Sequence, residues 1–376
     1  MNRTIDIEFN KFPVTPQENL LDTNTNGYLK FLDIDLLELT ALYKIEEFDD
    51  YSLPTSCKEY PALHYLIANT DLFKFILGQP GKGKDSRREN SRVLGQSLCR
   101  YFNSKFLNAP YMANISDFIG RQLNDEFNNV RIERKSSGDT PDFISASSSH
   151  SIFLSEAKGR RRIIPFTDKD FDKWRKQFDR ISILSNDTEL SLKGYIFEVA
   201  IANEKNKISN SKILVEDPYT SGEKFEYNED LFNLTKYGHY KRVLQKMGLQ
   251  FIGNALIYKE KLSQNKFEFQ TFKSKKTNKE YIGVFMPKSP FIFDFPYWEI
   301  GIREYRQIFK RHSSYFFGID KTVFKKLISV ARGSKENLGN IEISKGDFSD
   351  ESHFLFEDST LLCDPYLISI GDFEQF

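Results

Sequence analysis

Cysteine, histidine and long apolar runs are all scarce in this chain of 376 residues, and each scarcity excludes a class of protein. The three cysteines, Cys57, Cys99 and Cys363, are far apart and odd in number, which argues against a disulfide framework and a cysteine-rich zinc site. The five histidines are scattered and form no recognisable ligand cluster. No run approaches the ~18 to 20 apolar residues of a membrane helix, and the first residues lack the apolar stretch of a secretory signal. We therefore expect a cytoplasmic protein that does not contact a membrane.

The chain also lacks net charge, because its 53 basic residues match its 53 acidic ones. It has no global field that would attract nucleic acid, so any such affinity must come from local patches. Internal repeats and long low-complexity segments are missing as well. What the chain does have is apolar material, 39% of its residues including 35 Phe and 18 Tyr, which is enough to bury a large core.

Hydrophobic spacing predicts an α/β protein made of three regions, 1–109, 110–205 and 206–376. Segments that begin at Tyr28, Pro61 and Glu89 carry apolar residues at spacings of three and four, so the first region is expected to be mostly helical. The second region mixes helical and strand patterns and forms the expected core. The third reads as a mixed α+β region, which we expect to recognise a substrate or partner.

A basic segment, "GQPGKGKDSRR", separates two of the expected helices. It nearly matches the phosphate-binding loop of nucleotide-binding proteins. However, Asp85 stands where that loop needs a hydroxyl, and the preceding segment reads as a helix where the loop needs a strand. We interpret the segment as a basic turn that could touch a phosphate backbone.

Within the core region we predict a helix, three strands, a helix and a strand, at residues 111–127, 129–135, 142–147, 152–158, about 167–181 and 194–202. Thr167 is the expected N-cap of the second helix, whose apolar face contains Phe171, Trp174, Phe178 and Ile181. Beyond residue 206 we predict strands at 251–260, 266–273 and 280–287, and helices at 302–312 and 320–331.

Three charges interrupt the otherwise apolar hairpin formed by the second and third strands of the core. If Ser148–His150 is the loop, Ser147 pairs with Ser151, and the antiparallel ladder then sets Asp142 opposite Glu156 at about 5 Å. Two facing carboxylates repel, and burial adds to the cost. A divalent cation reverses this effect, because Mg²⁺ is usually held by one or two carboxylates with waters and substrate phosphate. Lys158 would reach the same site.

Pro141, Asp142, Glu156, Ala157 and Lys158 resemble the PD-(D/E)XK motif of the restriction-endonuclease-like nuclease superfamily. The predicted order of helix, three strands, helix and strand also resembles the mixed-sheet core of that family, over about a quarter of the chain. The resemblance implies that Asp142, Glu156 and the backbone carbonyl of Ala157 bind Mg²⁺, with Mn²⁺ as an alternative. It also implies that Lys158 assists the water that attacks the phosphodiester. Without the resemblance, Glu156 and Lys158 could form an ordinary surface ion pair at a strand end.

Two further residues of the family pattern have candidates in this chain. Many members use a carboxylate from the helix before the motif, and we assign that role to Glu126, with Asp125 as its competitor. Some members carry a glutamine in the helix after the motif, where Gln177 stands. One branch has a tyrosine after this glutamine, and Ile181 takes its place here, which leaves the role of Gln177 open.

Local positive charge indicates a phosphate-bearing partner. Basic residues follow the motif at once and continue along the next helix at spacings of three and four; they are Arg160, Arg161, Arg162, Lys169, Lys173, Lys176 and Arg180. Beside a hydrolytic site they would neutralise nucleic-acid phosphates, so that affinity falls with salt. Asp172 and Asp179 lie on the same helix, so an ordinary solvated charged face is the alternative.

We therefore expect a cytoplasmic Mg²⁺-dependent nuclease, an endonuclease that hydrolyses DNA, with RNA as a further substrate class to test. The family resemblance implies a restriction or anti-phage defence role, with a homodimer or a defence-system protein as partner. The alternative is a nucleic-acid-binding subunit of a defence or mobile-element complex that keeps the fold but cuts only with partners or not at all. A third reading is an interaction module in which the motif is coincidental.

Overall fold

The structure is a computed structural model that describes residues 2–12, 18–22, 24–25, 27–47, 66–67, 70–81, 83–127, 129–147, 151–218, 228–260, 262–264, 266–287, 314–334 and 353–376. These residues form two compact units. The first lies within 1–47, 62–240 and 257–259, and the second within 241–256 and 260–376. The division thus falls inside helix α4 (Glu229–Lys246). The predicted ranges 1–109, 110–205 and 206–376 place their boundaries elsewhere and stay predictions.

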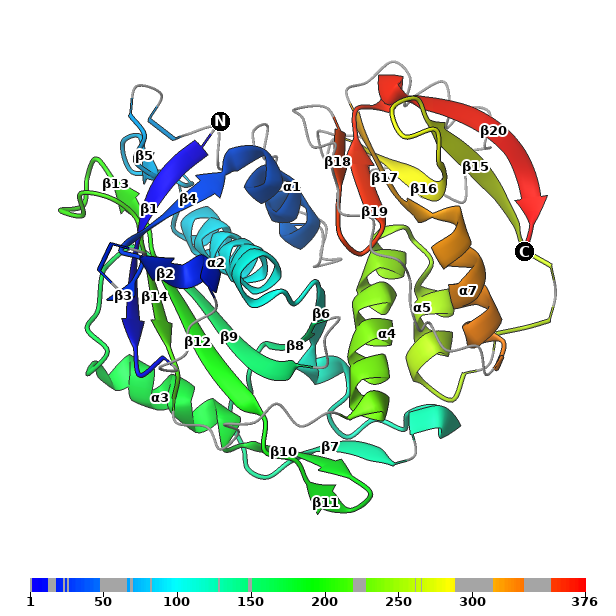
Figure 1. Ribbon diagram of the computed structural model, residues 1–376, viewed down its shortest axis with the longest axis horizontal. Coiled ribbons are helices and arrows are strands. Elements are labelled where there is room, and N and C mark those ends of the chain that lie inside the picture. Colours follow the sequence, from blue (N-terminus) through cyan, green and yellow to red (C-terminus); the bar gives the residue numbers. More distant parts are fainter. Residues whose placement is uncertain are drawn as a thin grey trace. The chain divides into compact units, whose positions relative to one another are not determined.

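A seven-stranded mixed sheet forms the centre of the first unit (Figure 1). Its strand order is β4-β1-β14-β12-β9-β8-β6, with only the β1–β14 and β12–β9 pairs parallel. In chain order the strands are β1 (Asn2–Asn10), β4 (Phe31–Asp35), β6 (Tyr111–Asn114), β8 (Phe143–Ala146), β9 (Ile152–Arg160), β12 (Lys193–Ala200) and β14 (Lys212–Glu216). The chain is therefore an α/β protein, as its hydrophobic pattern predicts.

Helices cover both faces of this sheet. Helix α2 (Lys84–Leu107) packs against β9 and β12 on the face that holds Ser155 and Gly159, because Asn103 Nδ2 donates to Ser155 Oγ at 3.1 Å. Helix α3 (Lys169–Phe178) lies on the opposite face and makes the crossover between the parallel strands β9 and β12. Its apolar residues Phe171, Trp174 and Phe178 are buried, as predicted, whereas Ile181, predicted on the same helix face, begins the strand β10 (Ile181–Ser185). The N-cap is Asp168, one residue later than predicted, because its carboxylate accepts from the Asp170 N–H.

The prediction of a mostly helical region over 1–109 is correct only in part for the described residues. Helix α2 confirms the helix expected from Glu89, and α1 (Leu36–Glu47) forms in the second half of the segment that begins at Tyr28. However, β1 and β4 are strands of the main sheet. In the segment that begins at Pro61, the described residues contain no helix and include the short strand β5 (Lys74–Phe75). Strand β1 alternates buried and more exposed residues, which is the pattern of a strand rather than a helix.

The predicted helix over 111–127 is also wrong. The chain there forms β6 followed by two 3₁₀ turns, η3 (Ile115–Asp117) and η4 (Asp125–Phe127). Ile115, Leu123 and Phe127 are buried, so the apolar spacing is real. A continuous helix is interrupted at Gly120, whose φ of 64° lies in the left-handed region.

The strand predicted over 129–135 forms as β7 (Val130–Arg134), but it does not join the hairpin. It pairs with β10 (Ile181–Ser185) in a separate sheet with β11 (Thr188–Glu189). Strand β6 takes the predicted place beside β8 instead. The remaining short strands of the first unit are β2 (Leu21–Asp22), β3 (Gly27–Tyr28) and β13 (Ala202–Asn203), and a 3₁₀ turn, η1, covers Glu18–Leu20.

The second unit contains a six-stranded antiparallel sheet in the order β18-β19-β17-β16-β15-β20. Its strands are β15 (Glu268–Ser274), β16 (Glu280–Pro287), β17 (Ser314–Asp320), β18 (His353–Leu355), β19 (Thr360–Cys363) and β20 (Ile368–Gln375), with the 3₁₀ turn η6 (Pro365–Leu367). Strands β15 and β16, and helix α7 (Lys321–Ala331), confirm three predictions. The strand predicted over 251–260 is wrong, because α5 (Gln250–Ile257) is a helix that buries Ile252, Ala255 and Leu256. The helix predicted over 302–312 lies outside the described residues.

Within the described part of the chain, none of the helices has the length and apolarity needed to span a bilayer. Cys99 and Cys363 are buried free thiols, whereas Cys57 falls outside the described residues.

Candidate active site

The charged hairpin has the predicted register. Strands β8 and β9 pair Phe143 with Ser155, so the next pair outward is Asp142 with Glu156. At the other end, the Ser147 N–H donates to the Ser151 carbonyl at 2.9 Å, which confirms the predicted pairing beside the loop. The loop residues 148–150 themselves lie outside the described residues. The two carboxylates therefore face each other because a short connection sets the register of two apolar strands.

Hydrogen bonds hold both carboxylates in place. The Asp142 N–H donates to Glu156 Oε2 at 3.1 Å, and the Ala157 N–H donates to Asp142 Oδ2 at 2.9 Å. Lys158 completes the group, because its Nζ contacts Glu156 Oε1 and lies 3.6 Å from Asp142 Oδ2. Glu156, Lys158 and Asp142 thus form one cluster in which a single ammonium group faces two carboxylates.

Burial within this cluster is uneven. The side chain of Glu156 is 0% exposed, whereas those of Asp142 and Lys158 are 29% and 30% exposed. Burial, and then the charge of Asp142, raises the pKa of Glu156 well above its ordinary value. Burial opposes the charged form of Lys158, but the carboxylates of Glu156 and Asp142 outweigh it and raise the pKa of that ammonium group. The site therefore carries more negative than positive charge when all three groups are ionised.

This donor set fits a small hard cation. Two neighbouring carboxylates, Glu156 on β9 and the partly exposed Asp142 just before β8, are the ligands that Mg²⁺ uses when waters and a phosphate complete its coordination. Lys158 already neutralises part of their charge, so an incoming cation would compete with its ammonium group. Asp142 and Glu156 would be the side-chain ligands, and the resemblance adds the carbonyl of Ala157, whose N–H is engaged by Asp142.

Glu126 lies away from this cluster. It belongs to the turn η4, where burial and the charge of Asp230 raise its pKa to about 7. The competitor Asp125 forms an ion pair with Lys259 at 2.9 Å. Among the described residues, no group of three or more His, Cys, Asp or Glu side chains is placed to hold one metal ion. Glu126 therefore does not complete a three-carboxylate site with Asp142 and Glu156.

Arg160 is held within the protein and does not project freely into solvent. Its guanidinium lies 4.7 Å from the centre of the Trp174 ring, donates to Asp170 Oδ2 at 3.0 Å and approaches Glu198 Oε1 at 3.6 Å. Asp170 also pairs with Arg162 at 3.7 Å and Lys173 at 3.0 Å. The hydrogen bonds from Lys173 and Arg160 lower the pKa of Asp170 to about 2. This single carboxylate therefore gathers three of the predicted nucleic-acid-binding side chains.

The other predicted contacts lie in different surroundings. Lys169 and Lys176 are exposed on α3, and Arg161 is half-buried just beyond the end of β9. Gln177 is buried, and its Oε1 has no hydrogen-bond partner. Arg180 donates to the Asp139 carbonyl at 2.9 Å, in the turn that leads to Asp142. The predicted basic stripe is therefore not one continuous exposed surface.

Sequence reasoning missed Glu198, which lies on β12 directly beside Lys158 of β9. It is completely buried, and neither carboxylate oxygen has a hydrogen-bond partner. Burial outweighs the attraction of Arg160, Arg162 and Lys212 and raises the pKa of Glu198 to about 8. Its signal in the sequence is a glutamate inside the apolar run "GYIFEVAIA", the same kind of signal that identifies Glu156.

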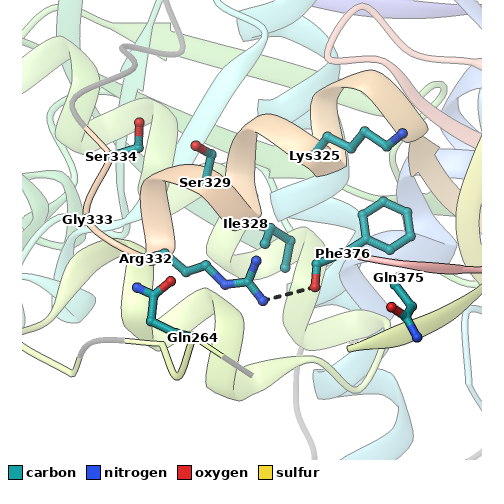
Figure 2. A pocket seen from close by; sticks show the side chains of 9 residues that line it. All are labelled: Gln264, Lys325, Ile328, Ser329, Arg332, Gly333, Ser334, Gln375 and Phe376. Carbon is teal, nitrogen blue, oxygen red and sulfur yellow. Dashed lines mark hydrogen bonds between the residues drawn. The ribbon is translucent and has the colours of Figure 1, made fainter. Parts of the chain in front are cut away.

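The second unit has a cavity of its own, with a volume of about 490 Å³. Figure 2 shows Arg332 at its wall, donating to the Phe376 carbonyl at 2.9 Å. The lining residues are Gln264, Lys325, Ile328, Ser329, Arg332, Gly333, Ser334, Gln375 and Phe376. None of them belongs to the predicted site.

Comparisons of this chain with models of protein families, with curated proteins and with solved structures find no match.

Proposed function

We propose that this chain is a metal-dependent nuclease of the PD-(D/E)XK type that hydrolyses phosphodiester bonds in DNA. The observation that carries the proposal is the cluster of Asp142, Glu156 and Lys158 on adjacent strands. A fold has no structural need to set two carboxylates face to face, because the arrangement opposes stability. A catalytic metal supplies the reason to keep it.

In the proposed reaction, Asp142 and Glu156 hold Mg²⁺ or Mn²⁺ by their carboxylates. A metal held there would supply a water molecule of lowered pKa and a positive charge for the phosphate oxygen. Lys158 orients the attacking water and offsets the charge that develops on the phosphate oxygens. The Ala157 and Asp142 N–H groups keep the two carboxylates fixed during this reaction, which reduces the cost of reorganisation.

The order of elements around the site supports the same assignment. Four strands of the main sheet and the two helices on it follow the chain order α2, β6, β8, β9, α3 and β12. Strands β7, β10 and β11, which lie between them in the sequence, belong to the separate sheet. The order is a helix, three strands, a helix and a strand, and all four strands belong to one mixed sheet, as the resemblance implies. The first helix is α2 and the first strand is β6, whereas the sequence predicts them at 111–127 and 129–135.

The biological setting that we propose is bacterial defence in the cytoplasm, either as a restriction enzyme or as an anti-phage effector. A second copy of the chain would allow both strands of a duplex to be cut. Both statements come from the family resemblance and are carried by the nuclease proposal.

A second function is favoured by one observation. Lys158 already contacts both carboxylates, and Glu156 is fully buried, so the cluster is largely neutralised without a metal. A protein that only binds nucleic acid, as a subunit of a defence or mobile-element complex, could keep this arrangement as a buried ion pair.

Cleavage assays separate the two functions. Purified protein is incubated with supercoiled plasmid, single-stranded DNA and RNA, in Mg²⁺, in Mn²⁺ and in chelator. The nuclease proposal expects metal-dependent cleavage that is lost in Glu156→Gln and Lys158→Gln. Lys135→Gln, which removes an exposed lysine paired with Glu189 outside the main sheet, is the matched control and should cut normally. Binding of nucleic acid without cleavage in any metal would favour the second function.

A further inference from the structure

Helix α2 and strand β9 pack against each other and run in opposite directions. Two contacts show which residues of the helix lie next to which residues of the strand. Asn103 near the end of α2 reaches Ser155, and Gly95 lies against Gly159. About two helical turns before Gly95, and two residues after Gly159, the same crossing brings Arg87 toward Arg161. The two arginines therefore approach each other because the backbones they belong to are packed together.

Close packing sets the distance between the backbones of α2 and β9 next to the two arginines. A Cβ at Gly95 would lie 2.7 Å from the Gly159 nitrogen, and a Cβ at Gly159 would overlap the Ser91 carbonyl. Both contacts are backbone to backbone, so the distance between helix and strand is set by the absence of side chains at these positions. Arg87 lies one helical turn before Ser91, close to this point of nearest approach.

The two arginines lack the carboxylate partners that several arginines on the neighbouring elements have. The described residues provide neither Arg87 nor Arg161 with a carboxylate partner, and the Nε of Arg161 is buried without a hydrogen-bond acceptor. Both side chains are half-buried. The comparable arginines are each paired, in Arg92–Glu89, Arg100–Glu46, Arg160–Asp170 and Arg175–Glu216.

An unpaired pair of cations opposes folding. Burial, and then the charge of Arg87, lowers the pKa of Arg161. Arg87 also lies in the first turn of α2, where the helix dipole adds further positive potential. An anion between the two guanidinium groups would remove this repulsion and supply the missing acceptors.

We propose that Arg87 and Arg161 together bind one backbone phosphate of a nucleic acid. Two guanidinium groups present several N–H donors in planar forks, which match the oxygens of a phosphate. The proposal deepens the nuclease function, on which its placement rests. Arg161 follows Lys158 by three residues, or about 10 Å of extended chain, and points to the other side of the strand. The pair would therefore hold a phosphate on the α2 side of the sheet, and not the reacting phosphate beside Lys158.

The test measures binding in the absence of cleavage. A fluorescently labelled duplex is titrated in chelator, at several salt concentrations, with the wild type, Arg87→Gln, Arg161→Gln and the double variant. Each single variant should lose about tenfold in affinity, and the slope of log affinity against log salt should fall by about one. The control is Arg131→Gln, an exposed arginine paired with Asp187, which should bind like the wild type.

Thermal unfolding provides the second measurement. Because removal of one guanidinium relieves repulsion, Arg87→Gln and Arg161→Gln should unfold at the same temperature as the wild type or higher. Weaker binding in variants that are at least as stable identifies a ligand site. Variants that bind like Arg131→Gln, or that lose binding only because they unfold, overturn the proposal.

Two further outcomes separate this proposal from the nuclease function and from free phosphate. If the arginine variants lose binding but the wild type cuts nothing in Mg²⁺ or Mn²⁺, the phosphate pair stands and the nuclease proposal fails. If inorganic phosphate raises the unfolding temperature of the wild type but the duplex does not bind, the pair recognises a free anion and the nucleic-acid assignment is wrong.

Discussion

Gly159 lies directly against the backbone of Ser91, at the point where α2 crosses the strand that carries Glu156 and Lys158. A side chain at residue 159 would have to push the helix away from the sheet. The position of the helix relative to the proposed active site therefore depends on a glycine that follows Lys158 in the sequence.

We predict that Gly159→Ala destabilises the first unit by about 1 to 3 kcal/mol or more, because the added methyl group overlaps backbone that cannot move independently. The free energy of unfolding, measured in urea, checks this. Gly27→Ala is the control, since a Cβ there would meet only Thr25 Oγ1 at 3.5 Å, an ordinary contact. Equal stability of the two variants would contradict the close packing of helix and strand.

Binding of metal should release a proton from Glu156. Because burial and the charge of Asp142 raise the pKa of this carboxyl, its proton must leave before the carboxylate can bind a cation. Affinity for Mn²⁺ should therefore increase with pH, by up to about tenfold per unit while Glu156 is protonated. Calorimetry at pH 6 to 8.5, in two buffers of different ionisation enthalpy, measures the affinity and the proton count. Glu156→Gln should abolish proton release, and pH-independent affinity in the wild type would count against Glu156 as a ligand.

The contributions of Glu156 and Lys158 to the free energy of unfolding should be coupled. Lys158→Met leaves Glu156 buried beside Asp142 without its cation, and we expect a loss of about 3 kcal/mol at pH 8. The loss should shrink as pH falls, because without Lys158 the pKa of Glu156 is raised further and its protonated form needs no cation. Glu156→Gln combined with Lys158→Met should recover most of the stability. Urea unfolding of the four proteins gives the coupling energy, and simple additivity would show that the contact contributes nothing.

The candidate site could be predicted from sequence because it depends on local features. A short loop and two alternating strands determine that Asp142 faces Glu156, and no distant part of the chain is needed. Hydrophobic spacing predicts a helix at residues 111–127, and this prediction is wrong. Apolar residues three and four apart also fit a strand followed by tight turns, which is what forms where Gly120 interrupts the helix. The local spacing of apolar residues does not determine whether the helix or the strand with turns packs better against the rest of the protein.

Long-range pairing accounts for most of what the sequence did not reveal. Strand β1 pairs with β14, which lies about 200 residues later, and nothing near either strand indicates this partner. The alternation of Ile5, Ile7 and Phe9 with Asp6 and Glu8 nevertheless indicates a strand, and it was available in the sequence. The approach of Arg87 to Arg161 is equally non-local, since it depends on the crossing of α2 and β9.

Glu198 should make the protein less stable as pH rises. Its pKa is raised from 4.5 to about 8 in the folded protein, so between these values the folded state holds a proton that the unfolded chain releases. The unfolded state binds fewer protons there, and the free energy of unfolding must fall with increasing pH. Below pH 4.5 both states are protonated and the effect vanishes. Above pH 8 it levels off, at no more than about 5 kcal/mol.

Glu198→Gln isolates this contribution, because glutamine keeps the shape and cannot ionise. We expect the variant to match the wild type near pH 5 and to exceed it in stability at pH 8.5, when both are unfolded in urea. Other buried carboxyls, such as Glu156, titrate equally in both proteins and cancel in the difference. Glu189→Gln, at an exposed position, should follow the wild type at every pH. If Glu198→Gln instead loses stability at pH 8.5, the ionised carboxylate is needed to hold Arg160, and its attraction to that arginine outweighs the cost of burial.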